Sequence, residues 1–142
     1  MKLKTRDIVY IGFIAALCAV ATTIRIEIPG GAMVHLGSAA LFTSSILFGG
    51  LYGGLGAAIG SALFDLFGGH TQYIVFSFFI KGIAGLIVGG MTAGYLPPSI
   101  TKPTASFTRI LSALIIGTIW TAFGYFLAWW FVLESAAVAA SK

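Results

Sequence analysis

The chain contains 142 residues, of which 58% are apolar and only 8% are charged, with a net charge of +4 and a mean hydropathy of +1.02. A soluble domain usually carries about 25% charged residues, so this composition excludes a soluble globular protein and indicates an integral membrane protein. The apolar residues run unbroken over helix-length stretches and do not alternate as in a membrane barrel. We therefore expect an all-α bundle of about five transmembrane helices that forms a single membrane domain over residues 1–142.

The first expected span covers residues 8–25. The basic residues Lys2, Lys4 and Arg6 precede it, and basic residues favour the cytoplasmic side of a membrane, so we expect a cytoplasmic N-terminus. A cleaved signal peptide, with small residues at 19–21 as its cleavage site, is the alternative. The length of the run and the apolar sequence that follows favour a membrane helix.

An external loop is expected from Arg25 to about His35, because Pro29 and the glycines after it prevent the helix from continuing. Residues 28–64 then contain no Asp, Glu, Lys or Arg. That stretch is too long for one span of about 20 residues and slightly short for two. We expect two short helices, 37–50 and 54–67, joined by a tight cytoplasmic turn in the glycine-rich segment 49–54. Short spans are tolerated when neighbouring helices bury them.

A second external turn at residues 68–70 precedes the fourth expected span, 73–95. A cytoplasmic connection containing Pro97, Pro98, Lys102 and Pro103 leads to the last expected span, 110–133. Lys102 and Arg109 join the three N-terminal basic residues on the inside, whereas Arg25 falls outside. Five spans would place the carboxyl terminus outside.

Small residues recur at four-residue spacing in three of the expected helices, which lets helix backbones approach closely. In the third and fourth helices this pattern (Gly53, Ala57 and Ser61; Gly85, Gly89 and Ala93) favours internal packing. In the first helix, Gly12, Ala16 and Val20 form a stripe with Ala15 and Ala19 beside it. This face could equally pack internally or bind a partner subunit.

Lys81 is the most informative single residue, because it lies roughly 12 Å below the external end of its expected helix. A lysine at that depth costs on the order of 2–3 kcal/mol unless it pairs, snorkels or meets water. Asp65 and His70 are expected near the same edge, so a structural ion pair and a substrate contact are both open. Aromatic residues crowd the same level (Tyr73, Phe76, Phe79, Tyr125 and Trp129). Apolar walls with a few converging polar groups are typical of a small-molecule site, although aromatic residues at span ends also form interface belts.

The sequence offers no constellation for catalysis. It contains no paired-carboxylate site, no serine with a plausible base and no phosphate loop with lysine. Histidine and cysteine spacing predicts no metal site, and no nucleic-acid motif is present. We therefore expect neither an enzyme nor a bound cofactor.

Three segments together resemble the S components of energy-coupling factor (ECF) transporters: His35-Leu36-Gly37, LFGGLYGGLGAAIGSALFDLFGG and FSFFIKGIAGLIVGG. The likeness is to the branch for riboflavin, hydroxymethylpyrimidine or pyridoxine-type substrates and covers most of the chain. The family commonly has an aspartate after His-Leu-Gly, where this chain has Ser38. The family also has six helices, so the resemblance implies that either a longer chain or a partner completes the wall of the pocket.

The resemblance implies a membrane subunit that captures a vitamin or precursor from outside the cell. It would dock on a transmembrane coupling subunit that works with two cytoplasmic ATPase subunits. The family docks through an Ala-x-x-x-Ala pattern in its first helix, which Ala15 and Ala19 match, with Gly12 and Ala16 on the neighbouring stripe. The residues expected to bind substrate are, in chain order, His35, Asp65, His70, Tyr73, Lys81, Tyr125 and Trp129.

Two other functions remain open at this point. The chain could be a structural or assembly subunit without a ligand of its own, or a self-contained small transporter that works as an oligomer. All three predict a multi-pass protein of the prokaryotic plasma membrane, in contact with lipid.

Overall fold

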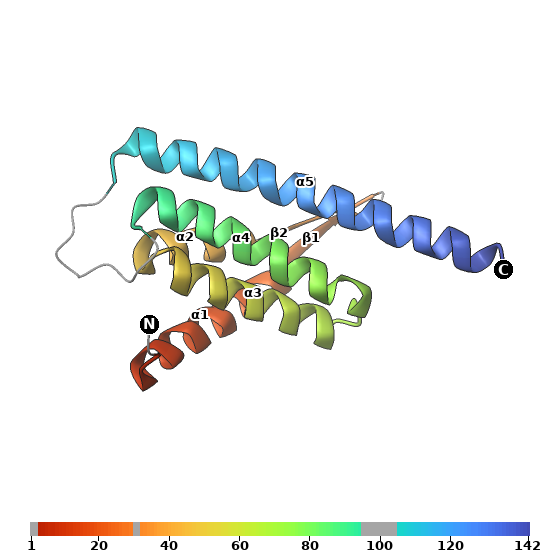
Figure 1. Ribbon diagram of the computed structural model, residues 1–142, viewed down its shortest axis with the longest axis horizontal. Helices are drawn as coiled ribbons and strands as arrows, with labels where there is room; N and C mark the ends of the chain where they lie inside the picture. Colours follow the sequence, from red (N-terminus) through yellow and green to blue (C-terminus); the bar gives the residue numbers. More distant parts are fainter. Residues whose placement is uncertain (1–2, 30–31, 95–104) are drawn as a thin grey trace.

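The computed structural model describes residues 3–29, 32–94 and 105–142. Over these residues the chain forms five helices and one small hairpin (Figure 1). The helices are α1 (Thr5–Thr23), α2 (Gly37–Phe48), α3 (Gly50–Phe67), α4 (Ile74–Thr92) and α5 (Phe107–Ala140). Strands β1 (Arg25–Ile28) and β2 (Ala32–His35) connect α1 to α2, and a single 3-10 turn (Thr71–Tyr73) leads into α4.

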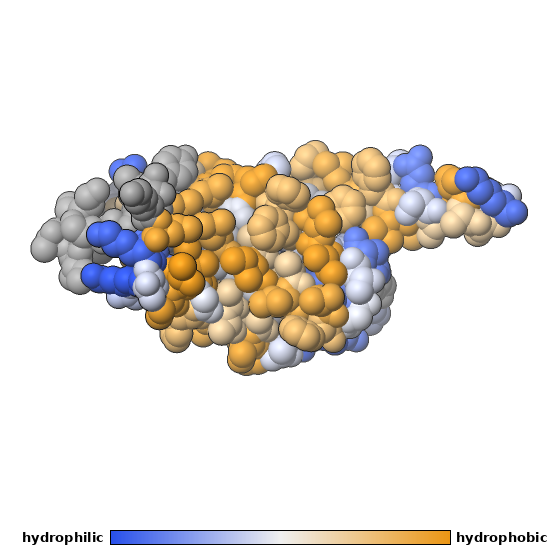
Figure 2. All heavy atoms as spheres, turned by 60° about the horizontal axis from the view of Figure 1, so that its bottom comes forward, coloured by the Kyte–Doolittle hydropathy of each residue, from blue (hydrophilic) through white to orange (hydrophobic). Residues whose placement is uncertain are grey.

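Four of the helices are long and apolar enough to cross a membrane: α1, α3, α4 with its preceding turn, and α5. The fifth, α2, has only 12 residues and spans about 18 Å. Figure 2 shows a broad hydrophobic band with hydrophilic residues gathered towards both ends of the molecule. This distribution is the one that a lipid bilayer requires, and it confirms the predicted all-α membrane architecture.

Within the segment predicted as an external loop, strands β1 and β2 pair as an antiparallel hairpin. Arg25 lies opposite His35, and Ile28 lies opposite Ala32. The hairpin pairs backbone N–H and C=O groups that would otherwise need water. It continues directly from the end of α1, where Ile24 takes an extended conformation.

The predicted helix 54–67 was too short, because α3 begins at Gly50. The turn between α2 and α3 is made by Gly49 alone, whose φ of +91° is open to glycine and strained for other residues. The backbone N–H of Gly50 then donates to the carbonyl of Gly94 at the end of α4 (2.9 Å). Gly50, Gly53 and Gly54 were expected in a turn, but they lie inside α3, where each packs against the backbone of a neighbouring helix.

Helices α3 and α4 approach so closely that glycine is required at their crossing. A methyl group added at Gly85 would lie 2.5 Å from the Cα of Gly54, and one added at Gly89 would collide with the Gly50 backbone. On the other side of α3, a methyl group at Gly60 would collide with the carbonyl of Ala15 in α1. The small-residue spacing of α3 and α4 therefore serves internal packing.

Helix α3 lies between α1 and α4 in the bundle, and α5 packs along the far side of α4 (Figure 1). The buried core joins the first four helices (Ile11, Ile14, Cys18, Leu41, Tyr52, Ala57 and Ala84). At the N-terminal end of α1, Asp7 accepts a hydrogen bond from the Tyr52 hydroxyl and so ties α1 to α3.

The last helix is longer than the predicted span 110–133. It covers 34 residues, or about 51 Å, and projects past the other helices at its C-terminal end (Figure 1). Its alanine-rich end has high helix propensity, which explains the extension. The fourth predicted span, 73–95, ends earlier, since Gly94 takes a φ of +89° beyond Thr92. The predicted proline-rich connection with Pro97, Pro98, Lys102 and Pro103 lies outside the described residues.

The close approach of α3 and α4 predicts a position-dependent effect of adding one methyl group. Gly85→Ala should lower the melting temperature of the detergent-purified protein, by a destabilisation of about 1–3 kcal/mol, because backbone must move to admit the methyl. Gly12→Ala is the matched control, since nothing lies within 4 Å of a methyl group there. Equal melting temperatures for the two variants would contradict this packing.

Candidate functional site

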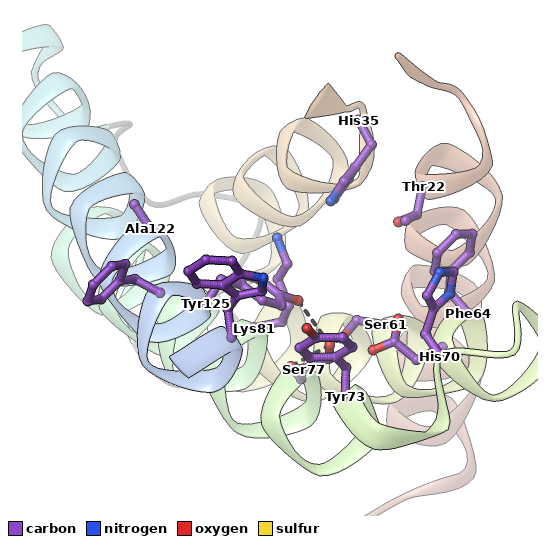
Figure 3. Close-up of a pocket in the computed structure, with 13 residues that line it drawn as sticks. Thr22, His35, Ser61, Phe64, His70, Tyr73, Ser77, Lys81, Ala122 and Tyr125 are labelled. Atoms are coloured by element: carbon purple, nitrogen blue, oxygen red, sulfur yellow. Dashed lines mark hydrogen bonds between the residues drawn. The ribbon is translucent and has the colours of Figure 1, made fainter. Parts of the chain in front are cut away.

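A pocket of about 590 Å³ lies at the end of the bundle that carries the hairpin and the α3–α4 connection. This is the end that the charge pattern predicts to be external. Its wall draws residues from α1, β2, α3 and the loop after it, the 3-10 turn, α4 and α5, which Figure 3 shows in close-up. The lining residues are Thr22, His35, Ser61, Phe64, Asp65, His70, Tyr73, Ser77, Lys81, Ala122, Tyr125, Phe126 and Trp129.

The seven residues predicted to bind substrate all line this one pocket. His35 ends β2, Asp65 lies in the last turn of α3, and His70 lies in the loop that follows. Tyr73 ends the 3-10 turn before α4, Lys81 lies inside α4, and Tyr125 and Trp129 lie one turn apart on α5. The fold brings the seven residues together because α3 ends where α4 begins, the hairpin after α1 ends on the same side, and α5 packs along α4.

Lys81 is only 4% exposed and points into the pocket (Figure 3). Its Nζ donates to the Ser38 hydroxyl on α2 (2.7 Å) and lies 5.4 Å from the centroid of the Tyr125 ring. The alternative of a structural ion pair with Asp65 is not realised, since the one ion pair among the described residues joins Arg25 and Glu27 (3.4 Å). The lysine therefore faces the pocket with neutral partners.

Hydrogen bonds between helices fix the wall that α5 contributes. The Tyr125 hydroxyl donates to the Ser77 hydroxyl (3.0 Å), and the Trp120 indole N–H donates to the carbonyl of Ile80 (3.1 Å). Ser61 in turn donates to its own helix and, more weakly, to the carbonyl of Ser77 (3.3 Å). These contacts hold the aromatic face of Tyr125 beside Lys81.

Part of the pocket wall carries buried polar atoms without partners. Asp65 Oδ2 and His70 Nδ1 are buried and make no hydrogen bond. The His70 ring stacks on the Phe64 ring, with 6.3 Å between the ring centroids. The guanidinium group of Arg25, which also pairs with Glu27, lies 5.7 Å from the centroid of the Phe64 ring. Buried polar atoms normally find partners, so these atoms mark a place where a ligand or water can bind.

His35 is held neutral where it joins the hairpin to α2. Its Nδ1 accepts a hydrogen bond from the Gly37 backbone N–H (3.1 Å). Burial, helped by the positive charges of Lys81 and Arg25, lowers the pKa of His35 from 6.5 to about 4. At neutral pH the imidazole is therefore an acceptor that organises the first turn of α2.

Six lining residues were not predicted: Thr22, Ser61, Phe64, Ser77, Ala122 and Phe126. Helical spacing could have found two of them, because Ser61 and Ser77 lie four residues before Asp65 and Lys81 and so share their faces. Thr22 reaches the pocket only through the packing of α1, and no local signal marks it. The contact between Ser38 and Lys81 also depends on how α2 and α4 pack.

The four residues predicted to dock a partner do not share one face. Gly12 and Ala16 are exposed, Ala19 is half-buried, and Ala15 is only 4% exposed against α3. The exposed stripe of α1 is thus the one formed by Gly12, Ala16 and Val20. Among the described residues, no group of three or more His, Cys, Asp or Glu side chains could hold a metal.

The described residues form an apolar helical bundle with a pocket of polar and aromatic side chains at one end. This is the architecture expected of a membrane protein that binds a small molecule. The family model for the ECF-type riboflavin transporter S component matches residues 2–142, nearly the whole chain. The chain belongs to this family. S components are substrate-binding membrane subunits for vitamin-type compounds and are not enzymes.

A protein of Pyrococcus woesei described as an uncharacterized protein in the gap 3′ region is 32% identical over 111 residues. The match covers 78% of this chain and 68% of that relative. The comparison with solved structures gave no match.

The depressed pKa of His35 predicts acid sensitivity. In the unfolded chain this histidine protonates near pH 6.5, whereas in the folded protein it stays neutral to about pH 4. Its contribution to stability is therefore complete above pH 6.5 and is lost progressively as the pH falls towards 4. His35→Asn keeps an acceptor but cannot titrate, so the melting temperatures of the two proteins should diverge over this range. Parallel pH profiles would contradict the assignment.

Proposed function

We propose that this chain captures a water-soluble vitamin or precursor from outside the cell and hands it to an ECF-type import complex. Its partners would be a transmembrane coupling subunit and two cytoplasmic ATPase subunits, which would supply the energy from ATP hydrolysis. The resemblance of the sequence favours hydroxymethylpyrimidine or another thiamine precursor, pyridoxine or riboflavin as the substrate.

One observation carries the binding role. Seven polar or aromatic residues from six segments of the chain line a single pocket of about 590 Å³. Pockets of roughly 300–1,000 Å³ suit small organic ligands. The volume, the aromatic walls and the unpartnered polar atoms in the pocket wall all support capture of a vitamin-sized molecule.

The exposed stripe of α1 is the proposed docking surface. Gly12 and Ala16 leave the helix backbone open to a neighbouring helix, which is the arrangement that favours close helix packing in a membrane. Ala19 extends this surface at its edge. Ala15 would support it from behind, because it is packed against Gly60 of α3.

The pocket predicts different effects for two adjacent tryptophans. Trp129 lines the pocket, whereas Trp130, which is exposed to a similar degree (58% against 52%), does not. Trp129→Ala should weaken vitamin binding about tenfold or more, because an aromatic wall is lost. Trp130→Ala should change it less than threefold (~0.6 kcal/mol).

The ligand for this test is the compound retained during purification, identified by mass spectrometry and then titrated into the emptied protein. Retention of no compound, together with no binding of riboflavin, pyridoxine or hydroxymethylpyrimidine, would favour a structural or assembly subunit. Equal loss of affinity in the two tryptophan variants would contradict the placement of the site.

The docking surface predicts that bulky side chains on α1 separate the subunits. Gly12→Leu combined with Ala16→Leu should abolish co-purification with the coupling subunit and the ATPases and leave ligand binding intact. Thr118→Leu, on an exposed face of α5, is the control and should preserve the complex. A complex that survives the double substitution would rule out this surface, and ligand uptake without any partner would favour a self-contained oligomeric transporter.

A further inference from the structure

The chemistry of the substrate can be narrowed from the surroundings of Lys81, provided that the pocket binds substrate as proposed above. Lys81 is the eighth residue of α4 and lies about 10 Å along the helix from its start. It is 96% buried, since its exposed fraction is 4%. Its ammonium group is therefore at the base of the pocket and not at the membrane surface.

The ammonium group of Lys81 has no carboxylate within ion-pair distance among the described residues. The sequence contains four Asp and Glu residues in total, and the structure describes all of them: Asp7, Glu27, Asp65 and Glu134. Asp7 bonds the Tyr52 hydroxyl and the Lys4 backbone N–H, and Glu27 pairs with Arg25. Neither Asp65 nor Glu134 forms an ion pair with Lys81 within 4 Å in this part of the chain.

The two groups that contact Lys81 are neutral. The ammonium group has three N–H donors, of which the Ser38 hydroxyl accepts one at 2.7 Å. The Tyr125 ring faces it at 5.4 Å, and the Tyr125 hydroxyl is engaged with Ser77. At least one donor is thus left for a group inside the pocket. A charge withdrawn from water costs several kcal/mol unless an opposite charge compensates it, so an anionic oxygen is the ligand group that gains most here.

A carboxylate in the same pocket limits how much negative charge the ligand carries. Asp65 lines the pocket and has an unpartnered buried oxygen, and His70 Nδ1 nearby is also unpartnered. A carboxylate disfavours a second negative charge and accepts an N–H or O–H donor. The rest of the wall includes Phe64, Tyr73, Tyr125, Phe126 and Trp129, which suits a flat, largely apolar body.

We propose that the substrate carries one ionised oxygen, a carboxylate or a ring oxide, which Lys81 binds while Ser38 orients the lysine. The other end of the substrate is a hydrogen-bond donor that meets Asp65. Among the vitamins favoured by the resemblance, a hydroxypyridine of the pyridoxine type has such an oxygen. A neutral pyrimidine or a neutral isoalloxazine offers Lys81 only an uncharged acceptor.

The decisive variants are Lys81→Met, which removes the charge, and Ser38→Asp, which supplies an internal counterion beside it. Both should raise the melting temperature of the empty, full-length protein in detergent, because each relieves an uncompensated buried charge. Both should weaken binding of an ionised-oxygen ligand at least about 30-fold. Lys81→Arg keeps the charge and should retain part of the affinity. If Lys81 were merely structural, Lys81→Met would instead lower the melting temperature of the empty protein.

Matched probes separate charge recognition from shape. Pyridoxine is compared with its 3-O-methyl ether, which cannot ionise, and nicotinate is compared with nicotinamide. In whichever pair the pocket admits, the native protein should bind the ionised member at least about 30-fold more tightly than the neutral member. Lys81→Met should reduce this affinity ratio to near unity. The two pairs distinguish a ring oxide from a carboxylate.

Five results would overturn the inference, and the first three concern the charge of the ligand. The first is a retained ligand with no ionisable oxygen, and the second is equal binding of both members of the pair that fits. The third is tighter binding of pyridoxal 5′-phosphate than of pyridoxine, which would show that the pocket accepts a ligand with more than one negative charge. Tight binding of neutral riboflavin that depends on Trp129 but not on Lys81 would overturn this inference and leave the proposed function standing. Absence of any retained or bound compound would overturn both.

Discussion

The backbone contact between α3 and α4 is the constraint on which the rest of the structure depends. Gly50, Gly54, Gly85 and Gly89 let the two helices approach so closely that an added methyl group would meet backbone atoms. In a membrane, helices associate through such packing because lipid tails give no hydrophobic drive for helices to pair. The contact fixes the relative positions of Asp65 near the end of α3 and Lys81 inside α4, and both residues line the pocket.

The pocket concentrates the polar chemistry of a chain that has little of it. Only a few described polar groups lie within the apolar bundle, and most are bonded to one another or to backbone (Ser61, Ser77, Trp120, Tyr125). Lys81, Asp65 and His70 keep unused hydrogen-bonding capacity. Buried groups of this kind cost stability in the empty protein, and these three residues line one pocket, which supports the proposed binding role. Ser45 Oγ is also buried without a partner but does not line the pocket.

The two small-residue patterns show why similar spacing leads to different surfaces. In α3 and α4 the glycines face each other and are covered. In α1, Ala15 is covered by Gly60, whereas Gly12 and Ala16 stay exposed one face away. Spacing of four residues shows that a helix has a face free of bulky side chains. It does not show whether that face meets a helix of the same chain or remains open, since this depends on the rotation of the helix in the bundle.

The sequence by itself determined the membrane architecture and the approximate positions of the helices, because hydropathy and the placement of charge are local properties that decide how a segment lies in lipid. It also suggested seven binding residues, and the structure gathers them along one pocket. Tertiary structure decided the rest. It converted an expected loop into a hairpin, reduced a predicted turn to Gly49, and extended α5 to Ala140. It also placed Ser38 against Lys81, 43 residues away in the chain, and left Asp65 unpaired with that lysine. Such pairings follow from helix rotation and depth in the bundle, which depend on contacts distant in sequence and so are not encoded in any single stretch.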